Sequence, residues 1–384
     1  LSAASSVTDA TGQTEVTYTA PPVTTQTPVT VTATFEGDAE YASSENSASG
    51  TIVLSQISTQ IVDSTGDVGY NSSIALDLGG YPHIAYFDGT NDDLKYARWS
   101  GSAWVIETVD SAGDVGRYAS IAVDSNGNPH ISYLDSTNED LKYAVRADSG
   151  WSIQTVDSAG YTGFGTSIAV DSAGRPHISY CDLSHGYLKY AYWDGSNWNI
   201  STVDAGGHVA GITSIDLDSH DRPHIAYWDG VYKDLKYAYW DGTSWDVQTV
   251  DSDFDVGRMP SIVVDSNDKP HISYYDYTYL DLKYAHWDGS SWNIQVVDSA
   301  GNVGTYSSID VDSSNRPHIA YYRSTNGNLK YAYWTGSEWS VQAVDTEGDV
   351  GMYASLAVDP SGTAHISYYD ATNGDLKYAQ VSPL

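Results

Sequence analysis

From about residue 57 onward, short runs of alternating apolar and polar residues are separated by turns rich in Gly, Asn and Asp. One unit of four runs contains the sequences Ser-Ile-Ala-Val-Asp, Pro-His-Ile-Ser-Tyr, Leu-Lys-Tyr-Ala and Trp-x-x-x-x-Val-Asp, and it recurs every 47 residues. Alternation with a period of two predicts strands, and no segment carries the apolar period of a helix over three turns. Four short strands in a repeat of about 40 to 50 residues are typical of a β-propeller blade.

The phase of the repeat predicts how the ring closes. Six units carry a fourth run that begins with a tryptophan, whereas the seventh ends at residue 384 without one. Residues 58–69 match residues 152–163, so the first run of the array supplies the missing strand. This closure leaves no sheet edge open. The sequence therefore predicts an all-β, seven-bladed propeller over residues 55–384, with its last blade completed by the N-terminal strand in a three-plus-one closure.

Residues 1–54 have a different composition, rich in Thr, Ser, Val and Ala, and alternation predicts strands at 14–20, 29–35 and 50–55. The sequence TGQTEVTYTAP…TPVTVTATFEGDAEYASS resembles the C-terminal half of bacterial immunoglobulin-like domains of the invasin type. A whole sandwich needs about 100 residues, so a partial module is expected. Such modules usually occur in tandem in long surface proteins. The resemblance therefore implies an extracellular or cell-surface location, within a larger polypeptide.

The charge balance excludes some partners. There are 17 Lys and Arg against 50 Asp and Glu, a formal net charge of −33. Nucleic acids and anionic membranes are bound by basic surfaces, so neither is expected as a partner. No run of about 18 apolar residues predicts insertion into a membrane. The single cysteine, Cys181, excludes an intrachain disulfide and a cysteine-based metal cluster.

One histidine recurs at the start of the second run of every unit. Together with Ser73 and Asp77, His83 offers the parts of a hydrolytic triad, but catalysis needs one asymmetric constellation rather than seven equal copies. We interpret the histidines as a structural ring, each oriented by a carboxylate such as Asp77, while Lys95 pairs with Asp63 or Asp77. No metal site is expected there, because ligands must converge on one ion at about 2.1 Å. The ring comprises His83, His130, His177, His224, His271, His318 and His365.

Function is expected where the units differ. The position just before the innermost strand carries Tyr70, Arg117, Phe164, Gly211, Arg258, Thr305 and Met352 in the seven units. The residue after it varies as well. The loops between the second and third strands of blades 3 to 5 add His185, Tyr187, Tyr232, Tyr277 and Tyr279. We predict that Tyr70, Arg117, Phe164, Arg258, Met352 and these loop residues bind a ligand on one face; the alternative is unselected variation at exposed loop positions.

Other motifs have less bearing on function. The turns at 193–198, 240–245 and 287–292 read Trp-Asp-Gly-Ser/Thr-x-Trp and resemble a degenerate Asp-box of sialidase-like propellers, which implies the fold. The acidic loop 251–257 leaves calcium open as a cofactor, although it lacks the glutamate and glycine spacing of an EF-hand; no other cofactor is expected. On the opposite face, Arg175, Arg222, Lys269 and Arg316 are expected to pair with the aspartate of their own turns.

These observations favour a non-catalytic extracellular binding or adhesion module that recognises a glycan or a surface protein through the variable loop face. The first alternative is a glycoside hydrolase or lyase of the sialidase-like propeller type. It requires clustered arginines at the mouth, and Arg117 and Arg258 stand three blades apart. The second alternative is a structural spacer of a surface layer or filament.

Overall fold

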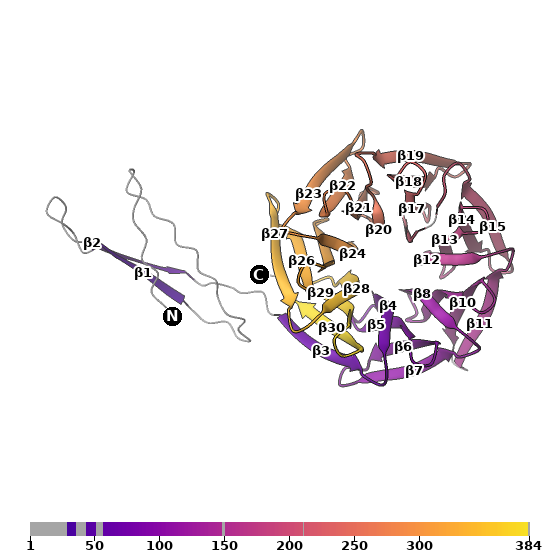
Figure 1. The fold of residues 1–384 in the computed structure, drawn as a ribbon, viewed down its shortest axis with the longest axis horizontal. Coiled ribbons are helices and arrows are strands. Elements are labelled where there is room, and N and C mark those ends of the chain that lie inside the picture. Colours follow the sequence, from indigo (N-terminus) through magenta and orange to yellow (C-terminus); the bar gives the residue numbers. More distant parts are fainter. Residues whose placement is uncertain (1–28, 36–43, 51–56, 148–149, 210, 383–384) are drawn as a thin grey trace. The chain divides into compact units, whose positions relative to one another are not determined.

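The computed structural model describes residues 57–147, 150–209 and 211–382, and the secondary structure of residues 29–35 and 44–50. From residue 57 onward, seven four-stranded antiparallel sheets stand as blades around a central axis (Figure 1). This confirms the all-β, seven-bladed propeller predicted from the repeat. In the described residues, no helix is long or apolar enough to cross a membrane.

Each blade runs from an innermost first strand to an outermost fourth strand. The first three blades are β4 (Val68–Leu76), β5 (Pro82–Asp88), β6 (Asp93–Trp99), β7 (Trp104–Asp110); β8 (Val115–Val123), β9 (Pro129–Asp135), β10 (Asp140–Ala147), β11 (Gly150–Asp157); and β12 (Thr162–Val170), β13 (Pro176–Asp182), β14 (Tyr187–Trp193), β15 (Trp198–Asp204). The next three are β16 (Thr213–Leu217), β17 (Pro223–Asp229), β18 (Asp234–Trp240), β19 (Trp245–Asp251); β20 (Arg258–Val264), β21 (Pro270–Asp276), β22 (Asp281–Trp287), β23 (Trp292–Asp298); and β24 (Val303–Val311), β25 (Pro317–Arg323), β26 (Asn328–Trp334), β27 (Trp339–Asp345).

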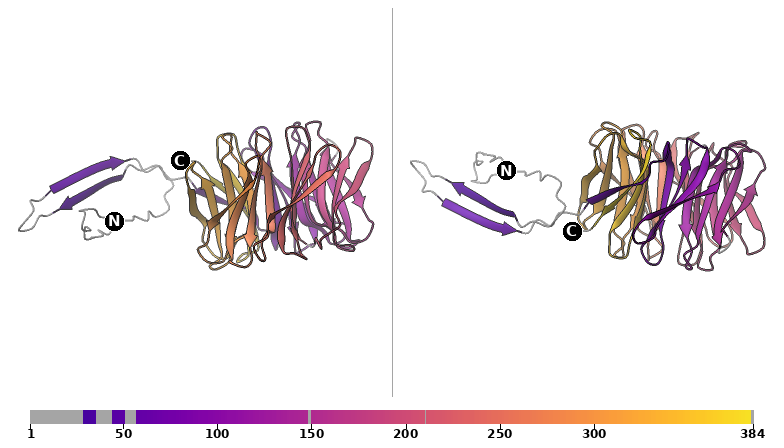
Figure 2. Two further views of the ribbon diagram at one scale, coloured as in Figure 1. Left: turned by 90° about the horizontal axis from the view of Figure 1, so that it is seen from above. Right: turned by 90° about the horizontal axis from the view of Figure 1, so that it is seen from below.

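The seventh blade joins the two ends of the array. It contains β28 (Val350–Val358), β29 (Ala364–Asp370) and β30 (Asp375–Val381), and its outermost strand is β3 (Ile57–Asp63). The predicted three-plus-one closure is therefore confirmed. In the views of Figure 2 the blades stand side by side, with loops at both ends of the strands.

Two strands precede the propeller, β1 (Val29–Phe35) and β2 (Ser44–Gly50), and they form an antiparallel pair. β1 lies at the predicted strand 29–35. The sequence did not predict β2, and the predicted strands 14–20 and 50–55 lie outside the described residues, apart from residue 50 at the end of β2. The immunoglobulin-like module therefore stays a prediction.

A repeated polar network ties neighbouring blades together. Asp63, at the end of β3, lies 2.5 Å from the Lys95 ammonium and accepts a 2.7 Å hydrogen bond from the Tyr86 hydroxyl in blade 1. Lysine–aspartate pairs of this kind occur in all blades except blade 4, where Lys236 has no such partner. The predicted pairing of the lysine with Asp63 is confirmed, and the Asp77 alternative is wrong. These buried charges stabilise the fold because each is paired.

The seven repeated histidines lie in buried positions between strands. The Nδ1 atom of His83 is 2.6 Å from the Tyr96 hydroxyl on the adjacent strand, and Nε2 is 3.6 Å from Asp77. The same tyrosine contact is made by every histidine of the ring. The nearest side-chain partner of each imidazole is therefore a tyrosine hydroxyl, which was not predicted from the sequence. The predicted carboxylate lies farther away.

The innermost strands are joined by a circle of seven equivalent hydrogen bonds. In each blade a serine hydroxyl accepts the backbone N–H at the matching strand of the next blade, at 3.0 to 3.2 Å, and the last blade bonds to the first. The acceptors are Ser73, Ser120, Ser167, Ser214, Ser261, Ser308 and Ser355. Each bond satisfies an N–H at the free edge of the innermost strand. We call this circle the serine ring.

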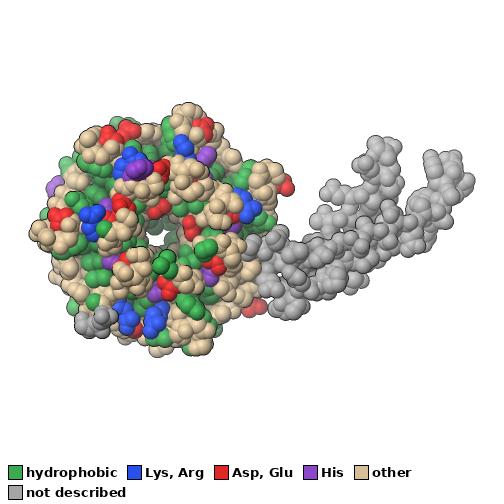
Figure 3. Space-filling view, turned by 180° about the vertical axis from the view of Figure 1, so that it is seen from behind, with side chains coloured by type: hydrophobic (Ala, Val, Ile, Leu, Met, Phe, Trp, Pro, Cys, Tyr) green, Lys and Arg blue, Asp and Glu red, His purple; other side chains and the backbone are tan. Residues whose placement is uncertain are grey.

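The propeller has two faces with different loops. The mouth face carries the loops before each first strand and the loops between second and third strands; Gly89 N–H, for example, donates to the Asp67 carbonyl across them. The turn face carries the turns between first and second strands and between third and fourth strands. The axial channel is visible as a hole at the centre of the face drawn in Figure 3, with acidic, basic and histidine side chains spread around it.

Candidate functional site: the axial cavity

A cavity of about 460 Å³ lies where the channel opens on the mouth face. The positions that the sequence predicted just before the first strands form its outer rim, and the residues that follow them form its inner rim. The prediction of their place is wrong in most blades, because Tyr70, Arg117 and Phe164 lie inside β4, β8 and β12. The cavity is lined by Tyr70, Arg117, Phe164, Gly211 and Arg258 of the outer rim, by Asn71, Tyr118, Ile212, Met259, Tyr306 and Tyr353 of the inner rim, and by Trp228. The inner rim also borders a channel of about 190 Å³ that is lined by the seven serines of the serine ring. A protein cavity of this size matches a small-molecule or sugar-sized ligand.

The inner rim has an unusual backbone conformation. Tyr118, Met259, Tyr306 and Tyr353 have φ between +50° and +55°, and Asn71 has φ of +49°. Bulky residues rarely adopt this left-handed region, because the Cβ atom crowds the backbone. Such strain costs about 1–3 kcal/mol per residue and is concentrated at functional sites. The same conformation recurs in six of the seven blades, including Gly165 with φ of +58°, so it belongs to the repeated backbone that holds these side chains at the mouth.

Aromatic rings make contact around much of the mouth. The centroids of Tyr306 and Tyr353 are 4.6 Å apart, and those of Tyr118 and Phe164 are 4.4 Å apart. Tyr70 lies 5.9 Å from Tyr353 and closes the gap between blades 7 and 1. Burial raises the pKa of Tyr118 to about 12, so its hydroxyl remains a protonated donor at neutral pH. The mouth thus presents aromatic faces together with hydroxyl groups.

The two arginines of the outer rim are already neutralised. Arg117 donates from Nε and Nη2 to the Asp114 carboxylate at 2.9 and 3.1 Å, with Asp92 3.7 Å away. Arg258 donates to Asp255 in the same two-pronged way, at 2.9 and 2.8 Å. These bonds hold each guanidinium in a fixed plane and offset its charge. Neither arginine is an uncommitted anion receptor.

The Arg258 guanidinium lies between two aromatic rings. Its central carbon is 4.8 Å from the Trp228 ring, on the cavity wall, and 3.9 Å from the Tyr277 ring of the neighbouring loop. Cation–π contacts of this kind add to the clamp made by Asp255. The indole N–H of Trp228 is buried and has no hydrogen-bond partner. Arg258 therefore connects the cavity wall to the loop between the second and third strands of blade 5.

Two glycines, Gly165 and Gly211, pack closely between blades 3 and 4. A Cβ at Gly165 would lie 2.3 Å from the Gly211 carbonyl oxygen. Beneath them, Cys181 is fully buried and its thiol contacts the Gly211 carbonyl at 3.0 Å. Burial raises the pKa of Cys181 to about 12, so it is not a thiolate nucleophile. Gly211 lines the cavity here between Phe164 of blade 3 and Ile212 of blade 4.

Two carboxylates, Asp216 and Asp310, lie on the innermost strands β16 and β24, where other blades carry alanine or valine. Asp216 accepts the Val264 N–H of blade 5 at 2.7 Å, and Asp310 accepts the Val358 N–H of blade 7 at 2.7 Å. Burial raises the pKa of Asp216 to about 6 and that of Asp310 to about 7, although each residue as a whole is half-buried. Each therefore adds a bond to the ring and titrates near neutral pH.

The structure gathers four of the predicted site residues at the cavity: Tyr70, Arg117, Phe164 and Arg258. Met352 does not line it. Of the loop residues, Tyr277 reaches the site through Arg258, whereas His185 stacks on Tyr187 and bonds to Asp182 away from the cavity. Tyr232 and Tyr279 are exposed on the mouth face. The sequence interpretation missed Trp228, which occupies a second-strand position that is tyrosine in three other blades.

No triad forms from the repeated residues. The Ser73 hydroxyl accepts the Ile121 N–H, the Nδ1 of His83 contacts Tyr96, and Asp77 holds the backbone of its own turn. A nucleophile needs a base within hydrogen-bond reach, and this arrangement supplies none. The same partners recur in the other blades.

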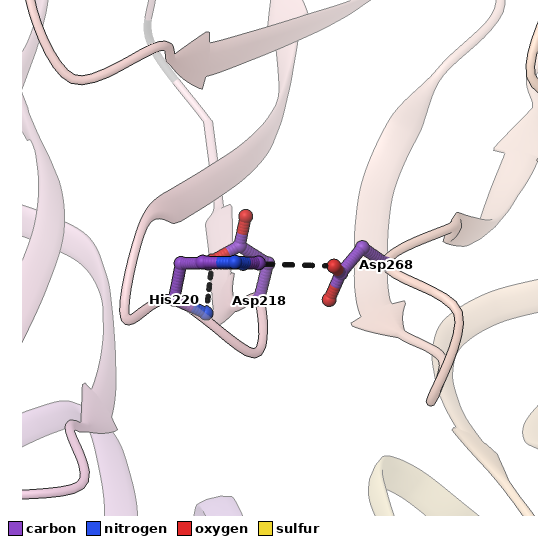
Figure 4. A group of neighbouring side chains, drawn as sticks. All are labelled: Asp218, His220 and Asp268. Carbon is purple, nitrogen blue, oxygen red and sulfur yellow. Dashed lines mark hydrogen bonds and ion pairs between the residues drawn. The ribbon is translucent and has the colours of Figure 1, made fainter.

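One group of potential metal ligands gathers on the turn face, Asp218, His220 and Asp268 (Figure 4). Asp218 is already bound by the Arg222 guanidinium at 2.6 Å and by two backbone N–H groups. Asp268 accepts two bonds from Ser219. A cation here would have to displace Arg222, so the donor set does not fit a metal centre.

The other acidic and basic motifs are likewise paired within the fold. In the loop 251–257, Asp251 binds Lys283 and Asp255 binds Arg258, so these carboxylates are not free for calcium. On the turn face the expected pairs of Arg175, Arg222 and Arg316 with the aspartates of their own turns are confirmed. Lys269 bonds to the aspartate of its turn, Asp265, through its backbone N–H at 2.8 Å, and the expected side-chain pair is not formed.

No family model matches the sequence, and no curated protein matches it. Solved structures do share the fold. An ulvan lyase of polysaccharide lyase family PL25 superposes with a TM-score of 0.56 at 13% identity, covering 84% of this chain and 96% of its own. A Dyadobacter fermentans protein of unknown function gives 0.54 at 11% identity, covering 85% and 99%. A variant of the Aleuria aurantia lectin in complex with Fucalpha1-6GlcNAc gives 0.52 at 16%, covering 73% and 98%. At these identities the likeness concerns the fold alone.

Proposed function

We propose that the protein is a non-catalytic glycan-binding module, which receives one unit of a carbohydrate in the axial cavity. The observation that carries the proposal is the inner rim, where large side chains are held in a strained conformation around a cavity of about 460 Å³. The outer-rim residue differs in almost every blade, and the inner-rim residue takes five identities, with tyrosine in three blades. Glycine would adopt the left-handed backbone of the inner rim without strain, yet five blades keep a larger side chain there, which supports a role in ligand binding rather than in folding.

The chemistry of the lining fits a sugar. Aromatic faces such as those of Phe164 and Tyr353 pack against the C–H face of a pyranose, and phenol hydroxyls bond its hydroxyl groups. The arginines, fixed by Asp114 and Asp255, present N–H edges in a defined plane. An apolar surface with a few fixed polar groups is the usual composition of a small-ligand site.

Two of the propellers of similar fold are described by their relation to carbohydrate, a lectin bound to a fucosylated sugar and an ulvan lyase. They support carbohydrate as the ligand class. We further propose that the module acts outside the cell or on its surface, within a larger polypeptide; the support is the resemblance of residues 1–54 to surface-protein modules. The partner on that surface is a glycan rather than a protein in this proposal.

A glycan array followed by calorimetry tests the binding. We expect Phe164→Ala to weaken binding of a glycan found on the array about tenfold, the loss of one aromatic contact. Ile153→Ala, an exposed position on the outer strand of the adjacent blade, is the matched control and should bind as the unmodified protein does. Equal affinity of Phe164→Ala and the unmodified protein would place the site elsewhere.

A second candidate is a glycoside hydrolase or lyase, and the raised pKa values of Asp216 and Asp310 favour it. A carboxyl group that titrates near neutral pH can act as a general acid. Against this, each carboxylate already accepts two backbone N–H groups. Reducing-end and unsaturated-product assays on a polysaccharide panel discriminate the two, because turnover that is lost in Asp310→Asn would overturn the non-catalytic assignment.

A further inference from the structure

Four exposed aromatic side chains stand beside the cavity on blades 4 and 5, and we call them the aromatic ridge. They are Tyr232, Phe254, Tyr277 and Tyr279, with exposed fractions of 66%, 68%, 50% and 60%. Exposed aromatics grouped in one place mark interaction surfaces on soluble proteins. The group contains the most exposed aromatic residues in the described part of the chain.

One ridge residue, Phe254, replaces the residue that the repeat otherwise uses. Phe254 occupies a position that is glycine in all six other units, and it adopts the left-handed conformation of those turns, with φ of +68°. Glycine takes this conformation without cost, whereas phenylalanine is strained there. The Phe254 side chain is 68% exposed as well as strained, so it adds little apolar burial to the fold.

Tyr232 and Tyr279 replace a second framework residue. In blades 1, 2 and 7 the equivalent asparagine donates a 2.9 Å side-chain bond to the aspartate that starts the loop, as Asn91 does to Asp88. Tyrosine gives up this bond and extends into solvent. Both substitutions therefore reduce local stability and expose an aromatic ring, in two adjacent blades.

The loops that carry the ridge are tied to one another. The Val256 N–H donates to the Lys233 carbonyl at 3.0 Å, and the Tyr277 N–H donates to the Asp255 carbonyl at 3.0 Å. Lys233 also lies 3.4 Å from the Asp255 carboxylate. The rings of Phe254 and Tyr279 meet edge to face at 6.2 Å. A surface fixed in this way loses little conformational freedom on binding.

The ridge is continuous with the axial cavity through Arg258. One side of its guanidinium faces Trp228 on the cavity wall and the other faces Tyr277 on the ridge. A ligand leaving the cavity toward blade 5 would pass from one aromatic surface to the next. Among the described residues that line the cavity, the cations are Arg117 and Arg258, and both are neutralised by carboxylates. The chain carries a net charge of −33. An anionic ligand would be repelled by this surface.

We propose that the aromatic ridge is a second subsite, and that the ligand is an uncharged oligosaccharide with one unit in the axial cavity and its following units across the ridge. This rests on the proposed function. Stacking of successive sugar rings on Tyr277, Tyr279 and Phe254 gives each added unit an aromatic contact, worth about a tenfold gain in affinity. The protein would therefore select its ligand by the number of sugar units as well as by the absence of charge on them.

The test uses the complete chain and calorimetry with cello-, manno- and xylo-oligosaccharides, each as mono-, tri- and hexasaccharide, beside oligogalacturonates of the same lengths. The ridge variant combines Tyr232→Asn, Phe254→Gly and Tyr279→Asn, the residues that other blades carry, so it keeps the fold and leaves Tyr277 on Arg258. Ile294→Thr, an exposed outer-strand change in blade 5, is the matched control.

We expect one neutral series to bind at least tenfold more tightly as hexasaccharide than as monosaccharide. The ridge variant should bind the hexasaccharide only as tightly as the monosaccharide, with monosaccharide affinity unchanged. Length-independent binding, an unaffected ridge variant, or tighter binding of galacturonates would overturn the second subsite while leaving the axial cavity as a glycan site. If no carbohydrate binds at all, the proposed function itself fails. Concentration-dependent self-association that the ridge variant abolishes would assign the ridge to a second copy and likewise overturn the inference.

Discussion

At the scale of single residues, the repeated histidines illustrate how burial decides whether a reactive side chain is used. Burial lowers the pKa of every histidine in the ring, to about 4 for His224 and His271, and the carboxylate nearby only partly offsets it. Each imidazole therefore stays neutral at physiological pH, and it contacts a tyrosine hydroxyl. A neutral, enclosed imidazole with no substrate access has a structural role.

This gives a prediction for acid stability. An unfolded histidine takes up a proton below about pH 6.5, whereas the folded ones resist it until a lower pH. Stability is thus fully present above pH 6.5 and is lost as pH falls toward 4. Asp216 and Asp310 act oppositely, because their folded pKa values are raised to about 6 and about 7 and they favour the fold at low pH. Burial also raises the pKa of Asp93, Asp140, Asp234, Asp281 and Asp375, which act in the same direction as Asp216 and Asp310.

Urea unfolding at pH 8, 6.5 and 5 measures the effect. The free energy of unfolding should fall below pH 6.5, accompanied by proton uptake on unfolding. The paired carboxylates such as Asp63, whose pKa is lowered, contribute only below about pH 4 and do not confuse the comparison. Stability that is constant or rising from pH 7 to pH 5 would contradict the assignment of buried neutral histidines.

The role of a single residue could be predicted from the sequence where that residue recurs in every repeat. Framework residues such as His83 and Lys95 were recognised because they recur every 47 positions. Trp228 and Phe254 were not singled out, although a position-by-position comparison shows glycine at the site of Phe254 in every other unit. Which variable residues share one cavity could not be predicted, because His185 and Tyr187 vary as Tyr70 does and yet point elsewhere.

At the scale of elements, close contact between blades explains a repeated glycine. Gly257 has φ of +86°, and a Cβ there would lie 2.5 Å from the backbone Cα of Leu235 in the preceding blade. The equivalent glycines that the structure describes make the same contact. Gly242, in a hairpin turn, has φ of +101° with nothing within 4 Å. A side chain at Gly242 would meet backbone strain alone, whereas a side chain at Gly257 would meet backbone strain and a steric clash.

We predict that Gly242→Ala costs about 1 kcal/mol of stability, from the left-handed backbone alone. Gly257→Ala should cost about 2 kcal/mol more, because backbone atoms cannot move aside as a flexible side chain can. Denaturant unfolding of both variants measures the difference. Equal losses in the two variants would show that the blades can separate to admit the extra methyl group.

Strands were predicted well because each blade alternates with a period of two and ends at Gly, Asn or Asp turns. The exceptions have local causes. β16 begins only at Thr213, because the preceding residues Gly211 and Ile212 pack against Gly165 instead of pairing as a strand. β2 contains small polar residues, Ser44–Gly50, with no alternation to reveal it.

At the scale of the whole molecule, closure depends on β3. This strand completes blade 7, and its Asp63 binds Lys95 and Tyr86 of blade 1, so one strand joins both ends of the array. Without it, β30 would expose an unpaired edge and Lys95 would be buried without its partner. Removing one member of a buried pair costs about 3–5 kcal/mol.

We therefore expect a chain that begins at residue 64 to lose cooperative unfolding and to aggregate, whereas a chain that begins at residue 55 unfolds as the complete chain does. Thermal circular dichroism and size-exclusion chromatography of the two truncations make the comparison. A stable monomeric fold without residues 55–63 would show that three strands suffice for the last blade.

The serine ring also bears on how such a protein acquires new specificities. Seven equal bonds fix the circumference, so a change of side chain at one rim position leaves the other six where they were. Substitutions at well-separated rim positions should then contribute independently to binding. New ligand specificities can therefore arise by substitution at one rim position at a time, without loss of the contacts made by the other six.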